Sequence, residues 1–233
     1  MLECVFFDLY GTLVDIRTDE GSPRTCQAFE TWIAEVHGRV AAAREHERPL
    51  FEEIRRATAP GPFGEPDLGP VIAAHLAEVL GRAPDAGEVA AAAAAFRAAS
   101  RSRLGLVPGA VEALRLLSGR FRLGMVSNAQ WLFTKPELEQ LGIGAFFDPL
   151  VISSEVGVRK PGRAIFARAL ALAGVGPAAA LHVGDSPYAD VGGAAAAGLR
   201  TCLVGPAAHH RGLPVVPDLR AGSVAELPAL LPG

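Results

Sequence analysis

The segment from Val5 to Val14 constrains the fold more than any other part of the chain. It is an apolar run, rich in β-branched and aromatic residues, that is interrupted by Asp8 and by Gly11 before apolar residues resume. Such a run predicts a buried strand, and open α/β sheets bind their ligands at the carboxyl ends of their strands. Asp8 is therefore expected at the edge of the sheet where a ligand binds.

Polar residues follow two further predicted strands in the same way. One strand runs into Ser127-Asn128, and another runs into Asp185, with Asp190 just beyond it. Between them, Lys160 precedes a proline that opens a helix. If these strands are parallel, all of the polar groups meet in one crevice.

The spacing of apolar residues divides the chain into two regions. From residue 16 to residue 105 the period is helical, which predicts an inserted all-helical cap domain. The predicted helices begin at Pro23 and after Pro49 and span Val71–Leu80 and Pro84–Arg101. Two short hinges, near Asp15–Thr18 and Leu104–Pro108, are expected to let this cap move.

Residues 1–15 and 106–233 are predicted to form an α/β core, a Rossmann-like parallel sheet with right-handed crossovers. Its strands are expected at Phe121–Val126, Leu150–Ile152, Leu181–Val183 and Thr201–Val204. Its helices are expected at Val111–Leu117, Pro136–Leu141, Ala164–Ala173, Tyr188–Ala197 and Val224–Leu231. Residues 205–220 are expected to be irregular.

The motifs and their order resemble the haloacid dehalogenase superfamily, most of whose members are phosphatases. Its pattern is DxDxT, then a Ser or Thr after a strand, then a Lys, then GDxxxD or GDxxxxD. The matching residues are Asp8-Leu9-Tyr10-Gly11-Thr12, Ser127, Lys160 and Gly184-Asp185 through Asp190. The resemblance extends to about Val204 and implies the phosphatase-like branch with a helical cap inserted after the first motif.

The resemblance implies that Asp8 attacks phosphorus and forms an aspartyl-phosphate, with a small phosphate monoester as the substrate. It also implies that Ser127, the backbone N–H of Asn128 and Lys160 bind the phosphoryl group, and that Thr12 orients the first loop.

Mg²⁺ is the implied cofactor. Its implied ligands are Asp8, the backbone carbonyl of Tyr10 and Asp185, with Asp190 binding it directly or supporting a ligand. The crowding of the acids gives the physical reason, because two like charges ~4 Å apart cost about 4 kcal/mol at an effective dielectric constant of 20.

Tyr10 departs from the pattern. Phosphatases of the superfamily have a second catalytic acid here, which protonates the leaving oxygen, and a phenol with a pKa near ~10 replaces it poorly at neutral pH. A slow phosphatase is therefore expected.

Two alternatives stay open. Asp-x-Tyr-Gly-Thr also begins true 2-haloacid dehalogenases, in which the aspartate attacks a carbon that bears halogen and no metal takes part. These enzymes, however, carry a Ser-Asn-Ala-x-x-Asp type of segment where this chain has Gly184 to Asp190, and their cap arginine segment has no convincing match here, although Arg39 lies at a plausible distance. The other alternative is a catalytically weak ligand-binding homologue.

Composition excludes several other functions. A net charge of −3 and a pI near 6.1 give no basic surface for nucleic acid. The longest apolar stretch, 89–96, is far shorter than the ~20 residues of a membrane span. Without a leader-like segment in residues 1–20, a cytoplasmic monomer or homodimer is expected.

Cys4, Cys26 and Cys202 have no spacing that indicates a disulfide framework or a zinc site. The adjacent His209 and His210 are interpreted as part of a solvated tail. Selectivity for the substrate is expected to reside in the cap, where the candidate contacts are Arg24, Arg39, His46 and Arg55.

Overall fold

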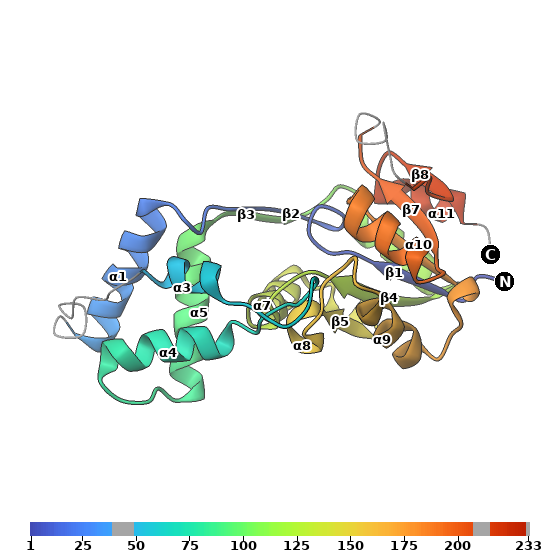
Figure 1. Cartoon of the computed structure of the whole chain (residues 1–233). Helices are drawn as coiled ribbons and strands as arrows, with labels where there is room; N and C mark the ends of the chain where they lie inside the picture. The colour runs from blue at the N-terminus through green and yellow to red at the C-terminus, as the bar shows by residue number, and fades with distance from the viewer. Residues whose placement is uncertain (39–48, 207–214, 232–233) are drawn as a thin grey trace.

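The computed structural model describes residues 1–38, 49–206 and 215–231. Its centre is a six-stranded parallel sheet with the strand order β5-β4-β1-β6-β7-β8 (Figure 1). The strands are β1 (Cys4–Phe7), β4 (Arg122–Ser127), β5 (Leu150–Ile152), β6 (Ala180–Gly184), β7 (Arg200–Val204) and β8 (Leu219–Ala221). The Rossmann-like α/β core expected from the sequence is confirmed.

Strand β1 lies in the middle of the sheet and is buried on both faces, which explains its continuous apolar sequence. Its side chains alternate between two hydrophobic clusters. Val5 and Phe7 join one cluster, and Cys4 and Phe6 join the other. This period of two places helices on both faces of the sheet and makes β1 the strand around which the sheet part is built.

The helices of the sheet part cover both clusters. Helix α6 contributes Leu114 and Leu117 to the first cluster, and α9 contributes Ile165 and Phe166 to the second. The α-helices of this part are α6 (Ala110–Ser118), α7 (Trp131–Leu141), α8 (Ser153–Val156), α9 (Arg163–Ala173), α10 (Gly193–Ala196) and α11 (Leu227–Leu230). The single-turn and π-helical segments are η1 (Gly144–Phe146), η2 (Pro177–Ala179), η3 (Pro187–Gly192) and η5 (Val224–Glu226).

Within the described residues, four further helices form a helical part beside the sheet, on the left of Figure 1. They are α1 (Pro23–His37), α3 (Leu50–Arg56), α4 (Gly69–Leu80) and α5 (Ala86–Ser100). Helix α1 begins as expected, with proline in its first turn and the Ser22 side chain accepting from the Thr25 N–H. The helices share a hydrophobic cluster that includes Phe29, Ile72 and Phe96.

The segments that join the two parts are not helical, so the predicted helical run from residue 16 to residue 105 is wrong at both ends. Strands β2 (Val14–Thr18) and β3 (Arg101–Leu106) pair antiparallel, with Val14 opposite Leu106. The two expected hinges are thus one two-stranded ribbon, which spans the space between the helical part and the sheet part in Figure 1. Inter-strand hydrogen bonds between segments far apart in sequence stabilise it.

Two further differences from the prediction are larger than one or two residues. Residues 205–220 were expected to be irregular, but Leu219–Ala221 pair with β7 as the edge strand β8. Helix α7 begins at Trp131, five residues before the expected start, with Pro136 inside the helix. In the described residues no helix is both long and apolar enough to cross a bilayer.

Candidate active site

The side chain of Asp8 follows directly after β1, at the carboxyl edge of the sheet, and is 8% exposed. Its N–H donates to the Val183 carbonyl (2.9 Å), which ties the chain after β1 to the neighbouring strand β6. Ser127 Oγ, at the end of β4, donates to Asp8 Oδ1 over 3.0 Å. Lys160 Nζ donates to the same oxygen over 2.7 Å. Both donors therefore hold one carboxylate oxygen and leave the other, Oδ2, for a ligand.

Lys160 is 3% exposed, unlike a typical solvated lysine. Its ammonium donates to Asp8 Oδ1, to Asp190 Oδ1 (2.6 Å) and to the Val126 carbonyl (2.8 Å). Burial by itself lowers the pKa of Lys160, but the two carboxylates outweigh burial and raise it, so the ammonium stays charged. Asn128 holds the lysine backbone on both sides, accepting from its N–H (2.7 Å) and donating to its carbonyl (3.0 Å).

Asp190 lies in η3 and is buried. Its Oδ1 accepts from Lys160 and from His182 Nε2 (2.8 Å), and its Oδ2 accepts from the Ser186 N–H (2.9 Å). Because a carboxylate only accepts, the proton of the histidine ring lies on Nε2. Burial raises the pKa of Asp190, but the Lys160 ammonium and His182 together outweigh burial and hold that pKa well below its ordinary value. With both oxygens engaged, Asp190 mainly orients Lys160.

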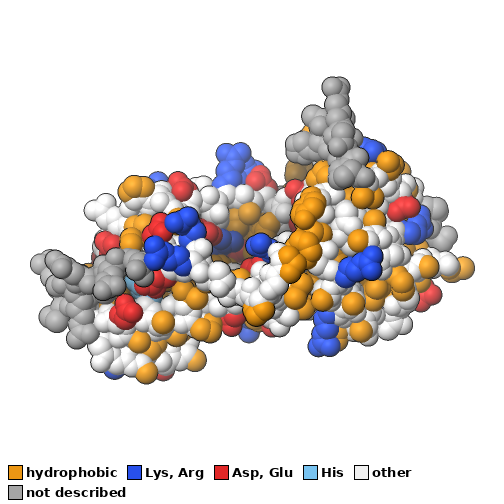
Figure 2. All heavy atoms as spheres, in the orientation of Figure 1, with side chains coloured by type: hydrophobic (Ala, Val, Ile, Leu, Met, Phe, Trp, Pro, Cys, Tyr) orange, Lys and Arg blue, Asp and Glu red, His pale blue; other side chains and the backbone are white. Residues whose placement is uncertain are grey.

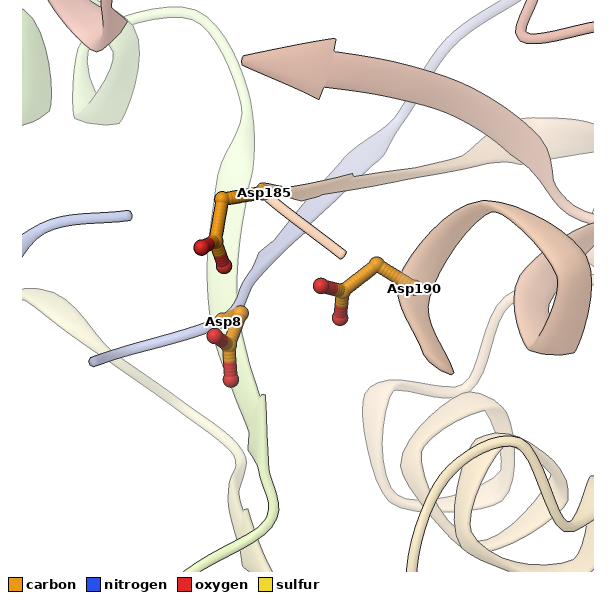
Figure 3. Close-up of side chains that lie close together, drawn as sticks. All are labelled: Asp8, Asp185 and Asp190. Carbon is orange, nitrogen blue, oxygen red and sulfur yellow. The ribbon is translucent and has the colours of Figure 1, made fainter. Parts of the chain in front are cut away.

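Asp185 follows β6 and completes a group of carboxylates with Asp8 and Asp190. One oxygen from each of these residues lies within 4.8 Å of the others, and their side chains point toward one another (Figure 3). Burial, followed by the charges of Asp8 and Asp190, raises the pKa of Asp185 to about 6. Such mutual repulsion is relieved by a hard divalent cation, so the donor set fits Mg²⁺.

The loop after Asp8 passes close to Asp185. Gly11 has a φ of +88°, and a Cβ there would lie 2.5 Å from Asp185 Oδ2, so any residue larger than glycine would displace that carboxylate. Thr12, which is buried, donates to Asp185 Oδ1 over 3.4 Å. The first motif therefore shapes the cation site as well as supplying Asp8.

The Tyr10 side chain reaches residues of α7. Its hydroxyl donates to Glu137 Oε2 and lies 3.2 Å from Thr134 Oγ1. Burial and the Glu137 carboxylate raise the pKa of Tyr10 above its ordinary value. Glu137 is 2% exposed and also accepts from Arg97 and Arg101.

The loop between α3 and α4 packs against the sheet part beside Lys160. The Arg159 N–H donates to the Phe63 carbonyl (2.8 Å), and Gly64 forms a β-bridge with Val158. The Gln130 side chain, at the start of α7, donates to Glu65 Oε1 over 2.9 Å. The helical part thus borders the site. Figure 2 shows Lys or Arg side chains within the hollow between the two parts.

Of the four candidate substrate contacts in the cap, two lie within the described residues. Arg24 and Arg55 are exposed, and Arg55 pairs with Glu52 at 3.2 Å. Arg39 and His46 lie outside the described residues, as do His209 and His210. The three cysteines are free, with Cys4 and Cys202 buried in β1 and β7.

The sequence interpretation missed three residues that the structure brings to the site: Arg97, Glu137 and His182. A signal was present for two of them. His182 is a polar residue in an otherwise apolar strand, and Glu137 shares a helical face with Thr134 and Leu138. Buried polar groups need partners, so both positions required a hydrogen-bonding neighbour. Arg97, within an alanine-rich helix, carried no such signal.

Comparison with known proteins gives consistent matches over most of the chain. The family model for haloacid dehalogenase-like hydrolases matches residues 2–198. The chain is 37% identical over 211 residues to the glyceraldehyde 3-phosphate phosphatase of Methanopyrus kandleri, covering 88% of this chain and 84% of that protein. It is 40% identical over 128 residues to the pyrimidine 5'-nucleotidase YjjG of Escherichia coli, a match that spans 54% of this chain and 56% of the relative.

Among solved structures, the 2-haloacid dehalogenase of Pseudomonas syringae is similar. It superimposes with a TM-score of 0.64 at 25% sequence identity and covers 99% of this chain and 98% of its own.

Proposed function

The chain belongs to the haloacid dehalogenase-like hydrolases, and we propose that it is a Mg²⁺-dependent phosphatase of small phosphate monoesters that acts through an aspartyl-phosphate on Asp8. The observation that carries the proposal is the placement of Asp185 within 4.8 Å of Asp8 and Asp190, beside Lys160. A carbon–halogen displacement needs no such group of acids, whereas phosphoryl transfer needs a cation to offset the charge of the phosphate.

The residues around Asp8 suit it to nucleophilic attack. Ser127 and Lys160 hold Oδ1, so Oδ2 is the oxygen that attacks phosphorus, and the leaving oxygen departs opposite to it. The Lys160 ammonium and the Ser127 hydroxyl would also donate to phosphoryl oxygens, and the positive charge of Lys160 would offset the charge of the phosphate. Water then cleaves the phosphoryl group from Asp8 and restores the carboxylate.

The residues that would hold Mg²⁺ are Asp8, Asp185 and the backbone carbonyl of Tyr10. Asp190, whose oxygens already accept three hydrogen bonds, would support the site through Lys160. When bound there, the cation supplies charge neutralisation between the nucleophile and the phosphoryl group.

Two observations favour a second function, 2-haloacid dehalogenation. Tyr10 takes the place of the acid that phosphatases of this kind use, and a 2-haloacid dehalogenase is among the similar structures. In that reaction Asp8 would displace halide from carbon, and the ester would be hydrolysed by water.

A screen separates the two functions. Phosphate release from p-nitrophenyl phosphate, glycerol phosphate and sugar phosphates is measured with Mg²⁺ or with EDTA, and chloride release is measured from 2-chloropropionate. We expect phosphate release that EDTA abolishes, and its loss in both Asp8→Asn and Asp185→Asn. Asp148→Asn, which changes an exposed carboxylate away from the site, is the control. Metal-independent chloride release without phosphate release would establish the dehalogenase instead.

A further inference from the structure

Glu137 is a buried carboxylate with an unusual number of donors. Its Oε1 accepts from Arg97 Nε (2.8 Å) and Arg101 Nη1 (2.8 Å), and its Oε2 accepts from the Tyr10 hydroxyl and Arg97 Nη2 (3.4 Å). A buried carboxylate is costly unless it is paired and hydrogen-bonded. Glu137, at 2% exposure, has partners on every side and is held in one position.

These partners come from three separate parts of the fold. Tyr10 belongs to the loop that follows β1, Glu137 belongs to α7 of the sheet part, and Arg97 belongs to α5 of the helical part. Arg101, the first residue of the β3 strand, belongs to the ribbon that joins the two parts. Glu137 therefore connects the catalytic loop to the helical part.

The contact between α5 and α7 is apolar as well as charged. Phe133 of α7 packs into the hydrophobic cluster of the helical part, and the Arg97 guanidinium lies 5.1 Å from the centre of its ring. Arg97 Nη1 also pairs with Glu20 (2.9 Å), which precedes α1. Docking of the helical part against α7 thus brings Arg97 to Glu137.

The Tyr10 hydroxyl has one proton, and it is donated to Glu137. With its proton donated to Glu137, the hydroxyl has none left to give to a leaving oxygen. The backbone of Tyr10, in contrast, lies between Asp8 and Gly11, which packs against Asp185. Through its hydrogen bond to Glu137, the Tyr10 side chain holds the loop after β1 against α7.

We propose that Glu137 is a positioning residue of the reaction, which holds the Asp8 loop through the Tyr10 hydroxyl and makes that position depend on Arg97 and Arg101 of the docked helical part. The proposal rests on the proposed phosphatase function. It assigns Tyr10 a role in geometry, so that its hydroxyl is not the acid for the leaving group.

The two roles predict different substrate dependence. Loss of a general acid slows alkyl esters, whose leaving alkoxide needs a proton, much more than aryl esters, whose phenolate leaves without one. Loss of positioning slows both by the same factor, because attack by Asp8 is impaired for either ester.

The test compares Tyr10→Phe, Glu137→Gln and the double variant on p-nitrophenyl phosphate and glycerol phosphate at saturating Mg²⁺. We expect kcat to fall about tenfold for both esters with KM nearly unchanged, since a hydrogen bond to a charged group is lost in each variant. The double variant should be no more than about twofold slower than the slower single variant, because both changes break one connection. Glu139→Gln, an exposed glutamate of the same helix, should match the parent.

Three kinetic results would overturn the proposal. They are a loss confined to glycerol phosphate in Tyr10→Phe, effects of the two single variants that multiply in the double variant, or a Glu137→Gln variant as active as Glu139→Gln. If Glu137→Gln fails to fold, Arg101→Gln tests the same connection, because Arg101 is the more exposed partner of its ion pair with Glu137.

Hydrogen exchange without substrate separates this proposal from the proposed function. Amides of β2, β3 and α5 should exchange faster in Glu137→Gln than in Glu139→Gln, whether or not the protein releases phosphate. If the parent protein is inactive on every ester but Glu137→Gln still exchanges faster than Glu139→Gln, the phosphatase is refuted and the connection stands. Equal exchange in the two variants would refute the connection.

Discussion

Replacing Lys160 by methionine should strongly destabilise the protein. The ammonium donates to Asp8, Asp190 and the Val126 carbonyl, all within 2.8 Å, and the residue is 3% exposed. Removing one partner of a buried ion pair typically costs ~3–5 kcal/mol because the other charge stays buried without compensation. Methionine keeps most of the side-chain volume, so a cavity adds little to this cost.

The lower end of that range applies here. Burial and the Asp190 charge already raise the pKa of Asp8, so the Asp8 carboxyl can take up a proton when Lys160 is lost. Asp190 keeps two other donors, His182 Nε2 and the Ser186 N–H. We therefore expect a loss of about 3 kcal/mol in the free energy of unfolding at pH 7 without Mg²⁺.

The pH dependence has a definite sign. The pKa of Asp190 is depressed in the folded protein, so its stabilisation is present above the unfolded value of ~3.9 and is lost as the pH falls through the folded value. The pKa of Lys160 is raised, so its stabilisation is present below ~10.4 and is lost as the pH rises through the folded value. The difference between parent and variant should therefore be full at pH 7 and should shrink below pH ~4.

Urea unfolding followed by circular dichroism measures this difference, with equal slopes in urea required for the comparison. Lys135→Met is the matched control because Lys135, the other lysine of the chain, is exposed on α7. A loss below ~1 kcal/mol, or a loss equal to that of Lys135→Met, would refute the view that the ammonium stabilises the buried carboxylates.

Three further predictions concern the carboxylates. The pKa of Asp185 is raised to about 6, so the folded metal-free protein binds that proton more tightly than the unfolded chain does. The free energy of unfolding should therefore fall by ~1–2 kcal/mol between pH 4 and pH 7. Asp185→Asn should flatten this part of the pH profile. Mg²⁺ should raise Tm more at pH 7.5 than at pH 5, because it binds the ionised carboxylates; an equal rise, or one that EDTA does not reverse, would contradict this. His182→Leu should lower the free energy of unfolding by ~1–3 kcal/mol, because Asp190 loses a buried hydrogen-bond donor. An unchanged urea midpoint would show that the hydrogen bond between His182 and Asp190 contributes nothing.

The residues after parallel strands could be predicted from the sequence because their geometry follows from local pattern. Asp8, Ser127 and Asp185 each end a short apolar run, and the carboxyl ends of parallel strands share one edge of the sheet. A residue that directly follows such a strand therefore lies at that edge of the sheet. The same reasoning underlies the confirmed Rossmann-like core.

The ribbon of β2 and β3 could not be predicted in this way. Apart from the buried Val14, its residues are half-buried or exposed and include Asp15, Arg17 and Arg103, so their apolar pattern is weak. What makes them strands is their pairing with each other, across more than eighty residues of intervening chain. The edge strand β8 is similar, because its three residues are a strand through their pairing with β7. Partners distant in sequence leave no periodic signal at either segment.

Tyr10 shows how the same limit affects a functional residue. In the sequence, Tyr10 shows only that the second acid of the first motif is absent, because the motif covers one short segment. In the structure its hydroxyl meets a carboxylate 127 residues away, and that carboxylate is held by arginines of a different helix and strand. An aspartate at this position lacks the reach of a phenol, so it would leave Glu137 without the donor that joins it to the catalytic loop. The residue that suits position 10 is thus decided by Glu137, Arg97 and the docking of α5 on α7, none of which the first motif contains.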